Sequence, residues 1–167
     1  MPAPSDVPEP SDVAAALLAR DAASRSIGIE IVGVGTGSAV VRMTVRTDMV
    51  NGHGVCHGGL IFMLADSALS FACNSGNVNT LAASASIDFV RPARLGTCLV
   101  ATASKVYQRS RTGYYDVVVT AENADDAGGE VIALFRGRTS ETGGAVIEAR
   151  PIKARPIKAR RLKATGP

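Results

Sequence analysis

The sequence has few cysteines, few histidines and no long apolar run. Its three cysteines form an odd set without a CxxC pair, which argues against a disulfide framework and fits a reducing compartment. No apolar stretch approaches the roughly 18 residues of a transmembrane helix. The acidic, proline-rich start, MPAPSDVPEP, is unlike the basic and apolar start of a signal peptide. We therefore expect a cytoplasmic protein without a membrane partner.

Charge is distributed unevenly along the chain. The formal net charge is +3 and the isoelectric point is about 9.0. From Arg150 onward there are seven Lys or Arg residues and no acid, whereas residues 1–149 hold 11 basic and 15 acidic residues, a net charge of −4. Because the basic character belongs to the end of the chain, a nucleic-acid partner is not expected for the domain.

The composition is that of one globular domain, with 46% hydrophobic and 20% charged residues. We place this domain at residues 11–144. Residues 1–10 are rich in proline and acid and are expected to be disordered. Residues 145–167 contain the repeat PIKARPIKAR and are expected to form a disordered, solvated tail, with binding of an acidic partner as the alternative.

The hydrophobic pattern predicts an α+β fold. A short helix is expected at residues 13–24, capped by Ser11 or Asp12, and a long helix that is apolar on nearly every side at residues 60–74. Strands are expected at residues 27–35, 38–47, 80–90, 97–108, 113–122 and 131–140. This order predicts a five- or six-stranded antiparallel sheet wrapped around one central helix, the hotdog architecture.

Asp66 is the one charged residue in the long apolar helix. Burial of an unpaired carboxylate costs several kcal/mol, and no Lys or Arg lies within ten residues of Asp66 on either side. A capping or ion-pair role in the core is the structural alternative. Desolvation raises a carboxyl pKa, which is how catalytic carboxylates are tuned, so we favour a catalytic role.

The segment His57-Gly58-Gly59 stands directly before this helix. Unpaired N–H groups at a helix N-terminus attract developing negative charge, so this segment could form an oxyanion hole, although two glycines also simply permit a tight turn. Asp66 lies about 12 Å farther along the helix axis than Gly58. If both groups act on one substrate, they should come from different subunits, which predicts at least a dimer.

Other chemistries fit the loop at residues 51–59 less well. His53, Cys56 and His57 are metal-ligand types, but the loop is broken by glycines and has no third histidine or acid nearby, so no metal is expected. A Cys56 nucleophile would need His57 or His53 as its base and a third group to orient that base, and is poorly supported. Asn51 can orient water or a carbonyl, although Asn-Gly is also a turn signal.

Six motifs carry a resemblance to a known family. They are NGHGVCHGG at 51–59, LADSA at 64–68, ACNS at 72–75, SIDF at 86–89 with RP at 91–92, GYYD at 113–116 and ALFRG at 133–137. Over residues 12–141 the sequence resembles the hotdog-fold thioesterases of the phenylacetic acid degradation pathway. The resemblance implies a homotetramer, a dimer of dimers, that hydrolyses aryl- or acyl-CoA thioesters without metal or cofactor.

The resemblance also implies roles for individual residues. Asp66 matches the catalytic carboxylate and Gly58 the backbone donor that polarises the thioester carbonyl. Asn51 and His57 match supporting polar residues of the catalytic site.

Substrate contacts are less sharply indicated. Gly59 belongs to the glycine pair that lets a ligand approach the backbone. Related thioesterases use a serine on the strand after the helix, for which Ser84 and Ser86 are both candidates. The loop arginines that could hold the CoA phosphates include Arg91, Arg109 and Arg111.

The function expected from the sequence is hydrolysis of an acyl-CoA thioester, with an arylacetyl-CoA as the favoured substrate. A non-catalytic acyl-CoA sensor on the same fold is the alternative, but mere binding does not require the buried Asp66. A hydratase or dehydratase would need an Asp/His pair, and no histidine follows Asp66.

Overall fold

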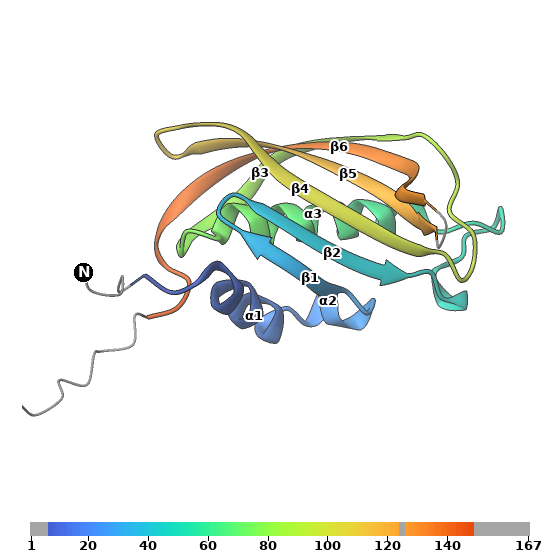
Figure 1. The fold of residues 1–167 in the computed structure, drawn as a ribbon, viewed down its shortest axis with the longest axis horizontal. Coiled ribbons are helices and arrows are strands. Elements are labelled where there is room, and N and C mark those ends of the chain that lie inside the picture. Colours follow the sequence, from blue (N-terminus) through green and yellow to red (C-terminus); the bar gives the residue numbers. More distant parts are fainter. Residues whose placement is uncertain (1–6, 124–125, 149–167) are drawn as a thin grey trace, which may run out of the picture.

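Helix α3 (Gly58–Asn74) lies on the concave side of a six-stranded antiparallel sheet (Figure 1). The computed structural model describes residues 7–123 and 126–148. The strands are β1 (Glu30–Gly35), β2 (Ser38–Thr44), β3 (Val78–Phe89), β4 (Cys98–Arg109), β5 (Thr112–Asn123) and β6 (Asp126–Ala145), in the order β1-β2-β4-β5-β6-β3. Because α3 contacts all six strands, the predicted α+β hotdog architecture is confirmed, with six strands.

The core forms between the apolar face of α3 and the inner face of the sheet. Leu64, Leu69 and Phe71 are almost fully buried on the helix, and Val117 and Val119 lie beneath it on β5. Leucine and alanine, the main residues of α3, are strong helix formers, and no proline interrupts them. The helix begins at Gly58, two residues before the predicted start.

The N-terminal helix differs from its prediction. The single helix expected at residues 13–24 is two helices, α1 (Pro10–Arg20) and α2 (Ala22–Ser26). The break falls at Asp21, whose carboxylate accepts the Ser24 N–H at 2.9 Å and so caps α2. The predicted cap at Ser11 or Asp12 is wrong, because α1 starts earlier, with Glu9 at its N-cap.

In the described part of the chain, strand β3 forms one free edge of the sheet and pairs only with β6. A bulge between Ala82 and Ser84 shifts the alternation of its side chains. After the bulge, Phe89 pairs with buried Ala133 and therefore lies on the inner face, toward α3. Ser84 pairs with Arg138 on the opposite, outer face.

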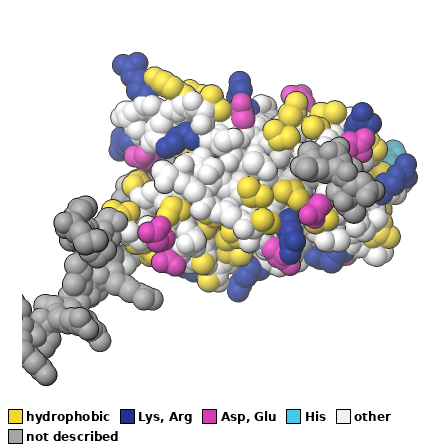
Figure 2. All heavy atoms as spheres, viewed as in Figure 1, with side chains coloured by type: hydrophobic (Ala, Val, Ile, Leu, Met, Phe, Trp, Pro, Cys, Tyr) yellow, Lys and Arg dark blue, Asp and Glu magenta, His cyan; other side chains and the backbone are white. Residues whose placement is uncertain are grey.

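The outer surface mixes charges of both signs, and the described part of the face in Figure 2 shows no continuous patch of one sign. On the outer face of the sheet, Arg136 pairs with Asp116 at 2.6 Å. Within the described residues, no helix has the length and hydrophobicity required to cross a bilayer. Of the segments predicted to be disordered, 1–10 and 145–167, only residues 7–10 and 145–148 are described, and the rest lies outside the described residues.

Candidate active site

The N-terminus of α3 is capped by a side chain. His57 Nδ1 accepts the Gly59 N–H at 3.0 Å, and the His57 carbonyl accepts the Leu60 N–H at 2.9 Å. No acceptor among the described residues takes the Gly58 N–H. The Gly59 amide is thus committed to the cap, whereas the Gly58 amide remains a donor at the positive end of the helix.

A pocket of about 290 Å³ opens beside Gly58. It is lined by Val55, Cys56, Gly58, Ile61, Phe89, Val90, Arg91 and Pro92. Its one charged lining residue, Arg91, pairs with Glu130 at 2.8 Å, and both side chains are largely exposed. The pocket therefore offers an apolar chamber, a backbone N–H and a cation at its rim.

Cys56 lines this pocket but is a poor nucleophile. Its side chain is 3% exposed, and burial raises the pKa of the thiol above its ordinary value. A thiol held in its protonated form has little nucleophilicity, since the thiolate is the reactive species. The geometry therefore agrees with the sequence argument against a cysteine nucleophile.

Asp66 lies half-buried on α3 and is absent from the lining of the Gly58 pocket. Within the described residues it forms no ion pair and no side-chain hydrogen bond. Burial, and secondarily the nearby negative charge of Asp21, raise the pKa of its carboxyl. Within one subunit, the carboxylate and the Gly58 donor are therefore separate features of the same helix.

Asn51 shapes the loop that precedes α3. Its Oδ1 accepts the N–H groups of His53 at 2.9 Å and Val55 at 3.4 Å, and its own N–H donates to the Val55 carbonyl at 2.8 Å. These bonds close a tight loop that delivers His57 to the helix N-terminus. Asn51 and His57 thus support the position of Gly58.

The structure does not bring Ser84 to the pocket. Ser84 is exposed on the outer face of β3 and accepts a hydrogen bond from Arg138 Nε at 3.3 Å. Ser86 pairs with Arg136 and lies on the same outer face. Directly before the bulge, Ala82 pairs with the buried Thr139, so the inner-face position next to the bulge carries an alanine and not a serine.

The three predicted arginines lie at different ends of the sheet. Arg91 lines the Gly58 pocket, as described above. Arg109 ends β4, and Arg111 lies in the exposed β4–β5 turn, where its carbonyl accepts the Glu141 N–H at 2.8 Å. Glu141 pairs with Thr80, near the start of β3, so this turn is at the end of β3 remote from Phe89.

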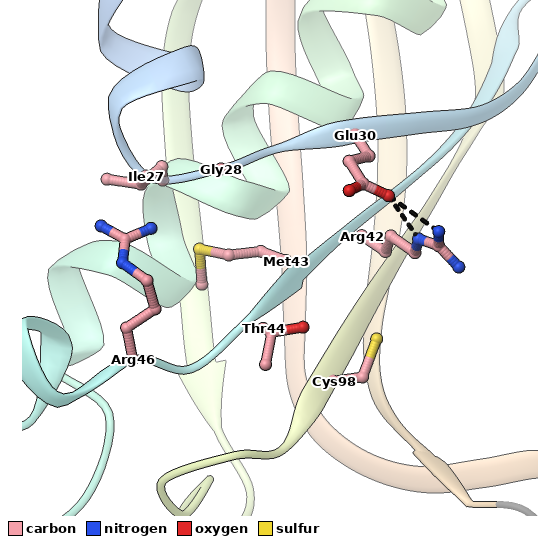
Figure 3. Close-up of a pocket in the computed structure, with 8 residues that line it drawn as sticks. All are labelled: Ile27, Gly28, Glu30, Arg42, Met43, Thr44, Arg46 and Cys98. Atoms are coloured by element: carbon pink, nitrogen blue, oxygen red, sulfur yellow. Dashed lines mark hydrogen bonds and ion pairs between the residues drawn. The ribbon is translucent and has the colours of Figure 1, made fainter.

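A second pocket, of about 300 Å³, lies at the other edge of the sheet (Figure 3). Figure 3 shows Arg42 of β2 directed toward Glu30 of β1, and their charged groups are 2.8 Å apart. The other lining arginine, Arg46, pairs with Asp48 at 2.9 Å. Gly58, whose amide is the available donor, does not line this pocket, so the pocket is the weaker candidate for the active site.

Sequence reasoning missed the walls of the Gly58 pocket. Phe89 and Val90 come from the end of β3, and Val55 and Ile61 flank the helix start. They are brought together by the packing of the start of α3 against the end of β3, which the sequence alone does not reveal. The signal that could have found them is the pair of apolar residues directly before Arg91-Pro92.

Comparison with known proteins finds relatives that are thioesterases. The profile of the thioesterase superfamily matches residues 53–128. The acyl-coenzyme A thioesterase PaaI of Escherichia coli (strain K12) is 41% identical over 131 residues, which cover 78% of this chain and 90% of that protein.

Solved structures agree with these sequence matches. The E. coli PaaI protein from the phenylacetic acid degradation operon superposes with a TM-score of 0.76 at 40% identity, covering 81% of this chain and 95% of that one. A mutant of phenylacetic acid degradation protein PaaI from Thermus thermophilus superposes with a TM-score of 0.65 at 34% identity, covering 71% and 96%.

Proposed function

The chain belongs to the PaaI-type acyl-coenzyme A thioesterases of the thioesterase superfamily, and we propose that it hydrolyses arylacetyl-CoA thioesters to the free acid and CoA. Phenylacetyl-CoA and its hydroxylated forms are the substrates we favour, because the E. coli relative comes from the phenylacetic acid degradation operon. The observation that carries the proposal is that, among the residues the structure describes, neither the Gly58 amide beside an apolar pocket nor the Asp66 carboxylate on the same helix has a bonding partner.

The proposed chemistry uses these two groups. The Gly58 N–H donates to the thioester carbonyl oxygen and stabilises the negative charge that develops there. Asp66 either takes a proton from the attacking water or attacks the carbonyl carbon itself to form a mixed anhydride that water then cleaves. In both routes the C–S bond breaks, the thiolate of CoA leaves, and it takes up a proton.

A complete site requires a second copy of the chain in this proposal. Strand β3 is a twelve-residue edge with exposed Leu81, and such edges pair with other strands unless they are protected. Two copies related by a two-fold axis pair β3 with β3 in antiparallel orientation. This pairing sets the two α3 helices side by side, so that Gly58 of one copy and Asp66 of the other share a substrate.

The same β3–β3 pairing indicates which arginines would bind the CoA phosphates. In an antiparallel β3 pair, the start of one strand faces the end of the other. Arg109 and Arg111 of one copy, which lie at the start of its β3, then approach the Gly58 pocket of the second copy. Together with Arg91 at the pocket rim, they provide positive charge for the CoA phosphates.

Release of free thiol from a panel of CoA thioesters tests the function. We expect phenylacetyl-CoA to be hydrolysed with a higher kcat/KM than straight-chain acyl-CoAs of similar size. Turnover of straight-chain thioesters alone would reject the arylacetyl assignment. Binding of acyl-CoA without release of thiol would instead support the non-catalytic sensor.

A further inference from the structure

We propose that Phe89 is the residue that selects aromatic acyl groups, by stacking on the aryl ring of the substrate next to the Gly58 amide. This inference rests on the proposed thioesterase function and adds a specificity-determining residue to it. Phe89 is the last residue of β3, and the backbone after it is fixed because the N–H groups of Val90 and Arg91 both donate to the Ile132 carbonyl, at 2.8 and 3.2 Å.

Phe89 differs from the other phenylalanines of the chain. Phe71 and Phe135 are 1% and 3% exposed, and Phe62 packs edge-on against Phe135 with ring centroids 5.2 Å apart. Phe89 also lies on the inner face of the sheet, yet it is 54% exposed. An aromatic side chain that faces inward and stays exposed has an unfilled space beside it, and that space is the Gly58 pocket.

The ring of Phe89 lies against the helix N-terminus. Its nearest carbons are 3.0 and 3.3 Å from the position that a Cβ on Gly58 would occupy. The absence of a side chain at Gly58 is therefore what lets the ring approach the amide. A thioester carbonyl bound to this amide must lie beside the ring.

The geometry of an arylacetyl group allows its ring to stack on Phe89. One methylene separates its ring from the carbonyl carbon, so a carbonyl held by Gly58 places the aryl ring at roughly the 4.5–7 Å centroid separation from Phe89 that is typical of aromatic pairs. The aliphatic side chains of Val55 and Ile61 also line the pocket and limit its shape, but they offer no aromatic contact. A straight-chain acyl group fills the same space without the aromatic contact.

Replacement of the ring by an aliphatic side chain tests the proposal. We expect Phe89→Leu to lower the ratio of kcat/KM for phenylacetyl-CoA to kcat/KM for hexanoyl-CoA by about 3- to 10-fold. Phe89→Tyr, which keeps the ring, should retain the wild-type ratio. Tyr107→Leu removes another exposed aromatic, 55% exposed on β4, and should leave both rates unchanged.

The outcomes separate this inference from the function on which it rests. A wild-type ratio in Phe89→Leu, in a protein that hydrolyses phenylacetyl-CoA, overturns the role of Phe89 and leaves the proposed function standing. Loss of the oligomer in sedimentation with an unchanged ratio shows that Phe89 only packs between subunits, which also overturns it. Failure of the wild-type protein to hydrolyse any CoA thioester overturns the proposed function itself.

Discussion

The imidazole of His57 and the amide of Gly59 form the cap of α3, with 3.0 Å between Nδ1 and N. This bond requires an unprotonated Nδ1, so the remaining ring proton of the neutral imidazole is on Nε2. It also uses the second amide of the helix and leaves the first, that of Gly58, available for a ligand.

The cap should contribute measurably to stability. We expect His57→Ala to lower the free energy of unfolding by about 1 kcal/mol, the usual cost of losing an N-cap side chain. His57→Asn should recover most of the loss, because asparagine is a favoured N-cap residue. Urea unfolding of the three proteins measures both effects, and equal stability of His57→Ala and wild type would contradict the cap.

Gly58 should be more important for rate than for stability. In Gly58→Val the new Cβ would meet the Phe89 ring at 3.0 Å, but that ring is half exposed and can move. The added side chain also crowds the carbonyl, and loss of one oxyanion donor costs on the order of 10²–10³ in kcat. Gly76→Val is the control, since no atom of the described residues lies within 4 Å of its Cβ position. Thiol release and thermal unfolding separate the two effects.

Asp66→Asn should abolish hydrolysis while the fold persists. Asparagine is nearly isosteric with aspartate but can neither take a proton from water nor attack the carbonyl, and a general base contributes about 10²–10⁴-fold. Single-turnover hydrolysis in ¹⁸O-labelled water distinguishes the routes, because label enters Asp66 only when the carboxylate attacks. Activity within about tenfold of wild type would reject Asp66 as the catalytic carboxylate.

The same substitution should stabilise the protein in a pH-dependent way. Burial, followed by the charge of Asp21, raises the pKa of Asp66 in the folded state, so its ionisation opposes folding. Below the unfolded carboxyl pKa of about 3.9 both states are protonated, and Asp66→Asn should have little effect on Tm. As the pH rises through the folded pKa, wild type loses stability that the variant keeps. A Tm difference that shrinks toward neutral pH would contradict this sign.

The free edge of β3 should hold the oligomer together. Leu81, on this edge strand, is 65% exposed, and a lysine on an edge strand opposes strand pairing. We expect Leu81→Lys to shift the protein toward smaller species in sedimentation velocity and to lose activity in parallel. Val106→Lys, at a 58% exposed position on the interior strand β4, is the matched control. A fully active wild-type monomer would refute the shared site.

The sequence was sufficient to predict α3, because its apolar run is long, free of proline and interrupted by one charge at Asp66. It did not predict the helix break at Asp21, where a local side-chain cap competes with continuation of the helix. The orientation of Ser84 could not be predicted from the sequence either. A bulge after Ala82 shifts the two-residue alternation, and bulges are set by pairing with β6 rather than by the strand's own residues.

The roles proposed for Gly58 and Asp66 came from local sequence signals, a glycine pair before a helix and a carboxylate within an apolar segment. The pocket walls had no such signal. Phe89 lies against Gly58 because the end of β3 packs on the start of α3, a tertiary contact that no local pattern indicates.

The end of α3 is tied to the start of β3 by a reciprocal pair of bonds. Asn74 Nδ2 donates to the Thr80 carbonyl and the Thr80 N–H donates to Asn74 Oδ1, both at 2.9 Å. The side-chain amide thereby imitates a neighbouring strand, and the free edge is partly immobilised before any second copy arrives. Because both backbone groups of Thr80 are already bonded, the β3–β3 pairing that we propose has to form beyond Thr80, on a strand whose start is already fixed and therefore loses less conformational entropy on association.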